Sequence, residues 1–410
     1  MRPGEVPARP GSSRAPPAPP SAPPEGRLVG LDLARGLAVL GMFAAHIGPD
    51  IEDGGVAGTV MQLTHGRSAA LFALLAGVTL VIIGGRRRPR TGLDGRRARA
   101  KITVRAVVLI ALGTGVAMLP APVDVILAYY GLCFLLALPL VRLRAGTLAV
   151  IAAVLAVAGP LLSFGARTVL DEQAWAQSWE HAIALYDPLE RLSHEGVVDL
   201  VLTGAYPVLS WLPYMIAGMA LGRLDLRAAR VRHRLLAAGS ALALAGYGAS
   251  WLAFHLIPGV PAAIADSGWL ESGPVTWWQG PETGTVDTGT PALLLVAAPH
   301  SGTPFEIVGN LGVAITVVVC AVALTDRWAR VRRPLLPVIA VGTMSLSVYV
   351  AHIVVLALLD SDDTFGGLPV LSAFIAAALV LAVLWTRHFR RGPLEHLLNA
   401  AAQAVARRLR

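Results

Sequence analysis

The chain has 410 residues, of which 55% are hydrophobic and only 15% are charged, and its formal net charge is +8 at pH 7. A soluble domain of this length needs far more polar surface, so the composition excludes a water-soluble globular protein and predicts an all-α, polytopic integral membrane protein. The positive net charge does not indicate nucleic-acid binding, because the arginines are divided among several short loops between apolar runs.

The first 26 residues differ in composition from the rest of the chain, since they are almost all Pro, Ala, Gly, Ser and Arg. Such a segment cannot bury an apolar core, and it holds no apolar stretch that could act as a cleaved signal peptide. We therefore predict a disordered cytoplasmic tail over 1–26, with the first membrane helix acting as an uncleaved insertion signal.

Ten apolar runs follow this tail, and each approaches the length of about 20 residues that a helix needs to cross a bilayer. They lie at 29–48, 66–84, 103–119, 123–141, 146–164, 203–222, 235–257, 305–325, 335–359 and 368–386. We therefore predict about ten transmembrane helices in one membrane domain over 27–390, followed by a basic cytoplasmic C-terminal tail over 391–410.

The loops between these runs alternate in charge. Arginine gathers in the loops at 86–101, 223–234 and 326–333 and at the end of the chain, whereas the intervening loops are acidic. Because cytoplasmic loops collect Lys and Arg, the alternation predicts a multi-pass protein of the cell membrane with both termini in the cytoplasm. The long connections at 165–202 and 258–304 are then outer loops, and their tryptophans indicate either a functional surface or interfacial anchors.

The first predicted helix carries three ionisable side chains, Asp32, Arg35 and His46. At about 100° and 1.5 Å per residue, Arg35 and His46 share one face and lie about 16 Å apart along the axis. Asp32 lies one turn before Arg35, where the two side chains can pair. The residues could be interfacial anchors and caps, but three on one stripe favour a polar passage.

Polar side chains also repeat at helical spacing in other predicted helices and gather in the loop before the eighth. The candidates are His65, Arg67 and Ser68 in the second helix, Tyr206 in the sixth, His300 in the loop and His352 in the ninth. One such stripe is well explained by hydrogen bonds between helices, but several in one chain indicate a polar cavity. No spacing of ligand residues indicates a metal site, and we expect no permanently bound cofactor.

Several segments resemble a known family. GLDLARGLAVLGMFAAH (30–46) and HGRSAALFALLAGVTL (65–80) are similar to the amino-terminal region of heparan-alpha-glucosaminide N-acetyltransferase-like membrane proteins, which belong to a transmembrane acyltransferase superfamily. GAYPVLSWLPYMIAGMALGRLDL (204–226), HSGTPFEIVGNLG (300–312) and GPLEHLL (392–398) resemble later parts of its bacterial members.

The resemblance implies acetyl-CoA or another acyl-CoA as donor, bound from the cytoplasm, and a glycan or lipid-linked acceptor of the cell envelope on the opposite face. In the mechanism that it suggests, Asp32 and Arg35 help to bind CoA, and His46 or His65 is the catalytic base. The other candidates hold the acceptor or stabilise an oxyanion; these are Arg67, Ser68, Tyr206, His300 and His352.

One departure from the family leaves the base open. The lysosomal-type enzymes carry Asn at the end of the first helix and take a histidine from the following loop, whereas His46 occupies the Asn place here. The role of His46 rests on the similar Arg–x10–His spacing of membrane acyltransferases that O-acetylate surface polysaccharides, and His65 remains its rival.

Two other functions fit the same residues. A transporter or exporter of a small polar or lipid-linked substrate would also line its path with ionisable groups, and a structural membrane partner would need no activity. The sequence is compatible with a homodimer.

Overall fold

The computed structural model of the chain describes residues 28–49, 51, 55–270, 275–281, 284–359 and 367–409. The tail predicted over 1–26 lies outside these residues. Every regular element in the described part is a helix.

The longer helices are α1 (Val29–Ile47), α3 (Arg67–Gly84), α4 (Gly92–Ala117), α6 (Ala145–Glu172), α10 (Ala229–Leu256), α12 (Pro304–Arg327) and α15 (Leu368–His388). The shorter helices are α2 (Gly55–Thr64), α5 (Leu127–Ala137), α7 (Ala174–Tyr186), α8 (Pro188–Ser193), α9 (Val208–Gly222), α11 (Val260–Asp266), α13 (Arg332–Thr343), α14 (Ser345–Leu359) and α16 (Pro393–Arg408).

Seven of these helices, with α2 and α3 taken together, are long and apolar enough to cross a membrane in the described part of the chain. The bent pair of α13 and α14 would make an eighth, and Leu127–Arg142 and Val208–Gly222 are shorter apolar helices. The prediction of an all-helical, polytopic membrane protein is therefore confirmed, whereas the number of ten spans stays a prediction.

Helices α13 and α14 meet at 75°, so the segment predicted as one span over 335–359 is not one continuous helix. Met344 lies between them and leaves the helical conformation, with φ −130° and ψ 35°. The carboxylate of Glu395 accepts hydrogen bonds from the backbone N–H groups of Leu346 at 2.7 Å and Ser347 at 3.3 Å. Since the first amides of a helix have no partner within it, Glu395 stabilises the start of α14 and favours the break.

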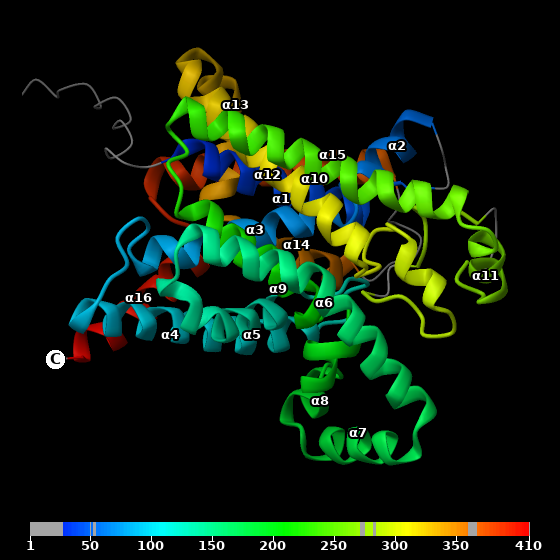
Figure 1. The fold of residues 1–410 in the computed structure, drawn as a ribbon. Coiled ribbons are helices and arrows are strands. Elements are labelled where there is room, and N and C mark those ends of the chain that lie inside the picture. The colour runs from blue at the N-terminus through cyan, green and yellow to red at the C-terminus, as the bar shows by residue number, and fades with distance from the viewer. Residues whose placement is uncertain are drawn as a thin grey trace, which may run out of the picture.

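Glu395 belongs to α16, a helix that the sequence analysis did not predict within the basic segment 391–410. It packs along α4, where Arg97 donates from Nη2 to the backbone oxygen of Leu409 at 3.1 Å. Figure 1 shows α16 beside α4 at one end of the bundle, whereas α2 and α11 lie at the opposite end. The helices that carry two of the basic runs therefore share one end of the molecule.

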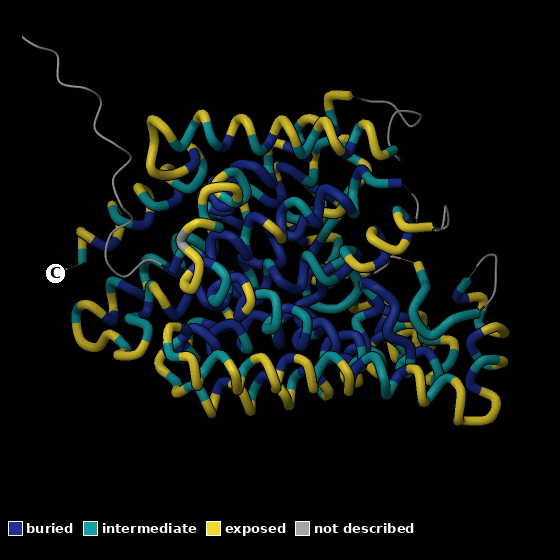
Figure 2. The backbone as a smooth tube through the Cα atoms, turned by 90° about the horizontal axis from the view of Figure 1, so that it is seen from above, coloured by how far each residue is buried: buried dark blue, intermediate teal, exposed yellow. Residues whose placement is uncertain are grey.

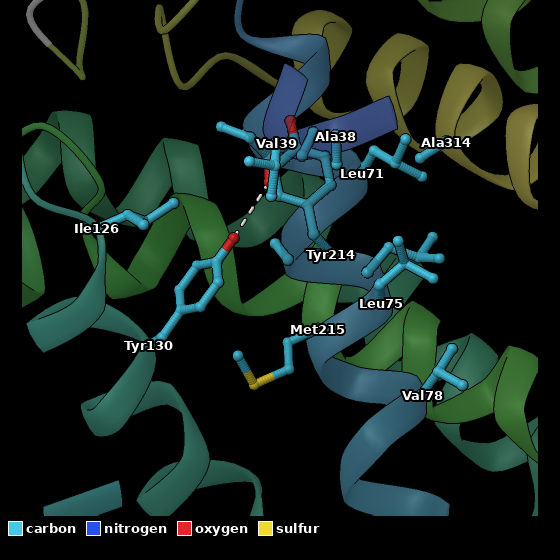
Figure 3. Packing of buried hydrophobic residues seen from close by; sticks show 14 of the residues in the cluster. Ala38, Val39, Leu71, Leu75, Val78, Ile126, Tyr130, Tyr214, Met215 and Ala314 are labelled. Atoms are coloured by element: carbon cyan, nitrogen blue, oxygen red, sulfur yellow. Dashed lines mark hydrogen bonds between the residues drawn. The ribbon is translucent and has the colours of Figure 1, made fainter. Parts of the chain in front are cut away.

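Helix α3 lies at the centre of the bundle and contacts α1, α9 and α12. In Figure 3, Leu71 and Leu75 of α3 face Tyr214 of α9, and the hydroxyl of Tyr130 on α5 donates to the carbonyl oxygen of Ala69 at 3.1 Å. Figure 2 shows buried residues through the middle of the bundle and exposed residues along its outer turns. Many exposed residues are large and apolar, such as Leu162, Leu244 and Leu381, as expected of a protein that faces lipid.

Helices α3 and α9 cross at very short range because each has a glycine at the crossing. A methyl group on Gly77 would lie 1.8 Å from the carbonyl oxygen of Met215, and one on Gly218 would lie 1.8 Å from that of Leu74. Both separations are far below a van der Waals contact, so any larger residue would push the backbones apart. Small residues at helix crossings are a usual source of tight packing in membranes.

We therefore expect Gly218→Ala to destabilise the protein by about 1–3 kcal/mol, the usual cost of overpacking. The measurement is the melting temperature of the purified chain in detergent. Gly248→Ala is the matched control, because an added methyl on that residue of α10 meets no atom within 4 Å and alanine favours a helix. Equal melting temperatures for the two variants would contradict the importance of the crossing.

Candidate functional site

A cavity of about 580 Å³ opens among α1, α3, α4, α5, α14 and α16. We call it the inner cavity, because it includes residues of α16 and of the basic segments at that end of the bundle. Its wall is mainly apolar, with side chains such as Leu31, Leu75 and Leu109. An elongated ligand with an apolar arm and an anionic end would match such a wall.

Asp32 and Arg35 line the inner cavity, as part of the first turns of α1. The pairing predicted between them is present, with Nη1 of Arg35 3.1 Å from Oδ1 of Asp32. Nη2 of Arg35 also donates to the hydroxyl of Thr79 on α3 at 2.9 Å. A guanidinium fixed by two partners on two helices has a defined direction, which suits it to bind an anion.

Four further arginines line the same cavity, namely Arg86, Arg105, Arg390 and Arg391. Glu395 is the other acidic residue besides Asp32 in its lining. Each of these carboxylates already accepts a hydrogen bond from protein, Asp32 from Arg35 and Glu395 from the start of α14. The cavity therefore has an excess of positive charge, and Nε of Arg105 is buried without a partner among the described residues.

An aromatic layer separates the inner cavity from the histidines beyond it. Phe72 and Tyr130 line the cavity, and their ring centroids lie 5.8 Å apart. Phe72 also stacks on Tyr349 at 6.3 Å, and Tyr349 contacts His352 at 5.2 Å. The ring contacts from the cavity wall to His352 thus pass through Phe72 and then Tyr349, and His46 itself is not in the cavity wall.

His46 and His352 form a hydrogen-bonded pair beyond this layer. Nδ1 of His46 lies 2.9 Å from Nε2 of His352, and the two rings are stacked with centroids 5.2 Å apart. His46 is at the end of α1, whereas His352 is on α14 and is 3% exposed. Ser345 and Tyr349, which share a helical face with His352 by their spacing, are also buried.

His65 and His300 lie near this pair, and we call the four residues the outer histidine cluster. His65 is in the turn between α2 and α3, and its Nδ1 donates to the carbonyl oxygen of Met61 at 2.9 Å. A neutral His65 therefore keeps its lone pair on Nε2. His300 lies in the loop before α12, with φ 58°, close enough to His65 and His46 to be influenced by their charge.

Arg67 takes part in a hydrogen-bond network beside the cluster. Its Nε donates to the hydroxyl of Tyr247 at 2.9 Å, and that hydroxyl donates to Oδ1 of Asn310 at 2.5 Å. Nδ2 of Asn310 donates to Glu306 at 3.1 Å. Glu306 also accepts from the backbone N–H of His300 at 2.9 Å. The network connects the start of α3 to the loop that holds His300, so it fixes that loop in place.

The remaining two candidates differ in their surroundings. Tyr206 is buried, and its ring contacts that of His300 at 5.5 Å and that of Trp211 at 4.9 Å. It lies before α9 rather than within it, because the helix begins only after Pro207. Ser68 faces α1, where a methyl group on Gly41 would lie 2.1 Å from its hydroxyl, so its position suits helix packing.

Three residues of these sites were not predicted from the sequence, namely Tyr247, Asn310 and Glu395. Tyr247 and Asn310 are lone polar residues in apolar runs, and the one sign of their role is that burial in a membrane helix requires a partner. Glu395 lies in the first turn of α16, where an acidic residue usually stabilises its own helix, but its target is the start of α14.

Comparison with known protein families adds two matches. A family model described as heparan-alpha-glucosaminide N-acetyltransferase, catalytic, matches residues 27–259, which is more than half of the chain. A model described as a protein of unknown function (DUF418) matches residues 292–404. No curated protein matches the chain. The first match includes Arg35 and His46 and the second includes His352 and Glu395, so both parts contribute to the inner cavity and the cluster.

The pH dependence of stability tests the position of His300 in the outer histidine cluster. Burial, together with nearby His65 and His46, lowers the pKa of His300 to about 3. Because an unfolded histidine titrates near pH 6.5, the unfolded chain binds more protons, and stability is lost as the pH falls through this interval. We expect the melting temperature to fall more for the wild type than for His300→Gln between about pH 7 and about pH 5. Equal pH dependence would contradict the desolvation of this partly buried ring and its proximity to His65 and His46.

Proposed function

Since the chain belongs to the heparan-alpha-glucosaminide N-acetyltransferase catalytic family, we propose that it transfers an acyl group, most simply acetyl, across the membrane. The donor is cytoplasmic acyl-CoA, and the acceptor is a glycan or glycolipid of the cell envelope. Both termini lie in the cytoplasm of a cell-membrane protein, in agreement with the basic runs at the end of the bundle where the inner cavity lies.

The observation that carries the proposal is the inner cavity with its five arginines. CoA has anionic phosphates at one end and a thin pantetheine arm at the other. Arginine matches phosphate oxygens with paired hydrogen bonds, so Arg105, Arg390 and Arg391 are suited to the phosphates. Arg35, held by Asp32 and Thr79, lies further along α1 toward the aromatic layer. The apolar wall then receives the arm.

The outer histidine cluster supplies the base. If His46 donates from Nδ1 to His352, the lone pair of the neutral His46 ring lies on Nε2, where it can take a proton. His352 then orients His46 and stabilises the imidazolium that forms. His65 also has its lone pair on Nε2, but it belongs to the turn before α3, whereas Tyr349 joins the aromatic layer to His352 and so to His46.

In this reaction His46 accepts one proton and then returns it, and no reactant is needed besides the acceptor and acyl-CoA. The acceptor hydroxyl or amine gives its proton to His46 as its oxygen or nitrogen attacks the thioester carbonyl carbon. The carbon–sulfur bond then breaks, and the CoA sulfur receives the proton from His46. Arg67 lies beside the cluster and is suited to stabilise the oxyanion, while Tyr206 and His300 would hold the acceptor. In a second version of this step, His46 carries the acyl group between donor and acceptor.

Transport of a small polar or lipid-linked substrate is the second candidate function. The observation that favours it is the 75° break between α13 and α14, since broken helices often form substrate sites in transporters. The start of α14 is, however, already capped by the carboxylate of Glu395. An anionic substrate would have to displace this carboxylate. The break by itself therefore supports transport less well than the arginines of the inner cavity support acyl transfer.

If the arginines of the inner cavity bind the phosphates of CoA, the loss of one of them should weaken the binding of acetyl-CoA. We expect Arg105→Gln to weaken acetyl-CoA binding by about ten- to a hundredfold, because a charge-assisted hydrogen bond contributes about 1.5–3 kcal/mol. Binding is measured by titration calorimetry on the purified chain. Arg88→Gln is the control, since Arg88 is exposed and does not line the cavity. If acetyl-CoA does not bind the wild type, the donor site is wrong and the transport function gains support.

If His46 is the catalytic base, replacing it should slow acetyl transfer without changing the affinity for acetyl-CoA. We expect His46→Ala to lower transfer of labelled acetyl by about 10²–10⁴-fold, the usual contribution of a general base, with acetyl-CoA affinity unchanged. His255→Ala is the matched control, because His255 is an exposed histidine at the end of α10. A large loss with His65→Ala and none with His46→Ala would assign the base to His65 instead.

A further inference from the structure

A pocket of about 420 Å³ lies beside the start of α4, at the end of the bundle where α16 also lies (Figure 1). We call it the α4 pocket. It is formed by Gly84 at the end of α3, by Arg90 in the following loop, by the first turns of α4, and by the short 3₁₀ helix Leu138–Arg142 that follows α5. It shares no lining residue with the inner cavity, so it is a separate site.

The charged groups in the lining of the α4 pocket are all cations. Arg90, Arg99 and Arg142 line it, and no carboxylate among the described residues does. The other lining residues are apolar or small, such as Leu138 and Ala98. Guanidinium groups from three elements around one hollow attract an anion, and their paired N–H donors match the oxygens of a phosphate.

The three guanidinium groups are not used within the protein. In the part of the chain that the structure describes, none of them makes a hydrogen bond or an ion pair, and all three residues are exposed. Other arginines of the same basic segment have protein partners. Nη2 of Arg87 lies 2.5 Å from Oδ2 of Asp225, and Nη2 of Arg97 donates to the backbone oxygen of Leu409. The α4 pocket therefore holds positive charge that a ligand can neutralise.

Close packing of two glycines gives the α4 pocket a defined wall. A methyl group on Gly84 would lie 2.4 Å from Cγ1 of Val141. One on Gly95 would lie 2.7 Å from the carbonyl oxygen of Arg90 and 2.9 Å from Nη2 of Arg142. The end of α3, the 3₁₀ helix and the loop before α4 thus meet directly, and the guanidinium of Arg142 rests against the first turn of α4.

The surroundings of the α4 pocket favour a lipid over a soluble anion. Leu138 and Pro139 line the pocket, and exposed apolar side chains continue beside it, with Leu136 of α5 46% exposed and Val107 of α4 55% exposed. Helices α4 and α5 pack against each other, so these side chains offer a surface for acyl chains. The basic runs predict that this end faces the cytoplasm, where basic pockets between membrane helices bind anionic headgroups.

We propose that the α4 pocket binds the headgroup of an anionic phospholipid of the inner leaflet. Arg99 and Arg142 donate to the phosphate oxygens, Arg90 adds positive charge, and the acyl chains lie along the exposed apolar residues of α4 and α5. The site does not depend on acyl transfer. It would place a lipid against α4, the helix that contributes Arg105 and Leu109 to the inner cavity.

The test compares two lipids with identical acyl chains on the purified full chain in detergent, by native mass spectrometry. Dioleoyl phosphatidylglycerol has a net negative charge, and dioleoyl phosphatidylcholine has none. We expect phosphatidylglycerol to bind at least about tenfold more tightly, because each basic residue near an anionic headgroup contributes a factor of about five. Equal binding of the two lipids would overturn the proposal, as would displacement of phosphatidylglycerol by inorganic phosphate at the same concentration, which would indicate a site for soluble anions.

Variants connect lipid binding to the α4 pocket. We expect Arg99→Gln and Arg142→Gln each to weaken phosphatidylglycerol binding about fivefold. The melting temperature without lipid should stay near that of the wild type, because both side chains are exposed. Arg144→Gln is the matched control, since Arg144 is also exposed but does not line the pocket. If Arg144→Gln and Arg142→Gln weaken binding equally, the lipid responds to general surface charge and the proposal fails.

Arg105→Gln distinguishes the α4 pocket from the inner cavity. Because Arg105 lines the inner cavity and not the α4 pocket, we expect this variant to leave phosphatidylglycerol affinity unchanged. A loss of lipid binding with Arg105→Gln and none with Arg142→Gln would place the lipid in the inner cavity and overturn the proposal. Acetyl-CoA does not enter these measurements, so failure of the donor site and failure of the lipid site are observed separately.

Discussion

Asp32 and Arg35 are paired inside an apolar helical bundle at 3.1 Å, and the inner cavity depends on this ion pair. An unpaired charge in such surroundings costs several kcal/mol, so the carboxylate and the hydroxyl of Thr79 together hold the guanidinium in one direction. The same requirement explains the network from Arg67 to Glu306, in which each buried polar group has a partner. Polar groups are thus held at two depths, one facing the inner cavity and one beside the outer histidine cluster.

Close helix packing fixes these groups relative to one another. A methyl group on Gly342 of α13 would lie 1.7 Å from the carbonyl oxygen of Asp32, so α13 touches α1 directly at the ion pair. One residue after α13 ends, the break at Met344 redirects the chain, and α14 carries Tyr349 and His352 to the cluster. Glu395 stabilises this break from α16 and also lines the inner cavity. The cavity wall and the histidine pair therefore depend on the same bent helix pair.

Much of this arrangement could be predicted from local sequence spacing. The apolar runs indicated the helices, and the spacing of Asp32 and Arg35 indicated their pairing, because both depend on helical periodicity within one segment. The break in the span at 335–359 could not be predicted in this way, since its run is apolar throughout and Glu395 comes from another helix. Tyr206 was assigned to a helical face, yet the helix begins only after Pro207, where the proline fixes the backbone at the helix start.

Two cavities carry opposite charge, so the two ends of the molecule favour different ligands. The inner cavity is lined by five arginines, whereas a second cavity at the end of α6 is lined by Asp171, Glu180 and Asp287 with one arginine, Arg167. On the acyl-transfer proposal, an anionic donor would be attracted to the first cavity and repelled by the second. Between them, Phe72 and Tyr349 close the path with one layer of stacked rings. On the acyl-transfer proposal, that layer must open for a thin pantetheine arm and then close again. Because the ion pair and the glycine crossings hold the backbone in place, we expect this opening to come from rotation of the two aromatic side chains.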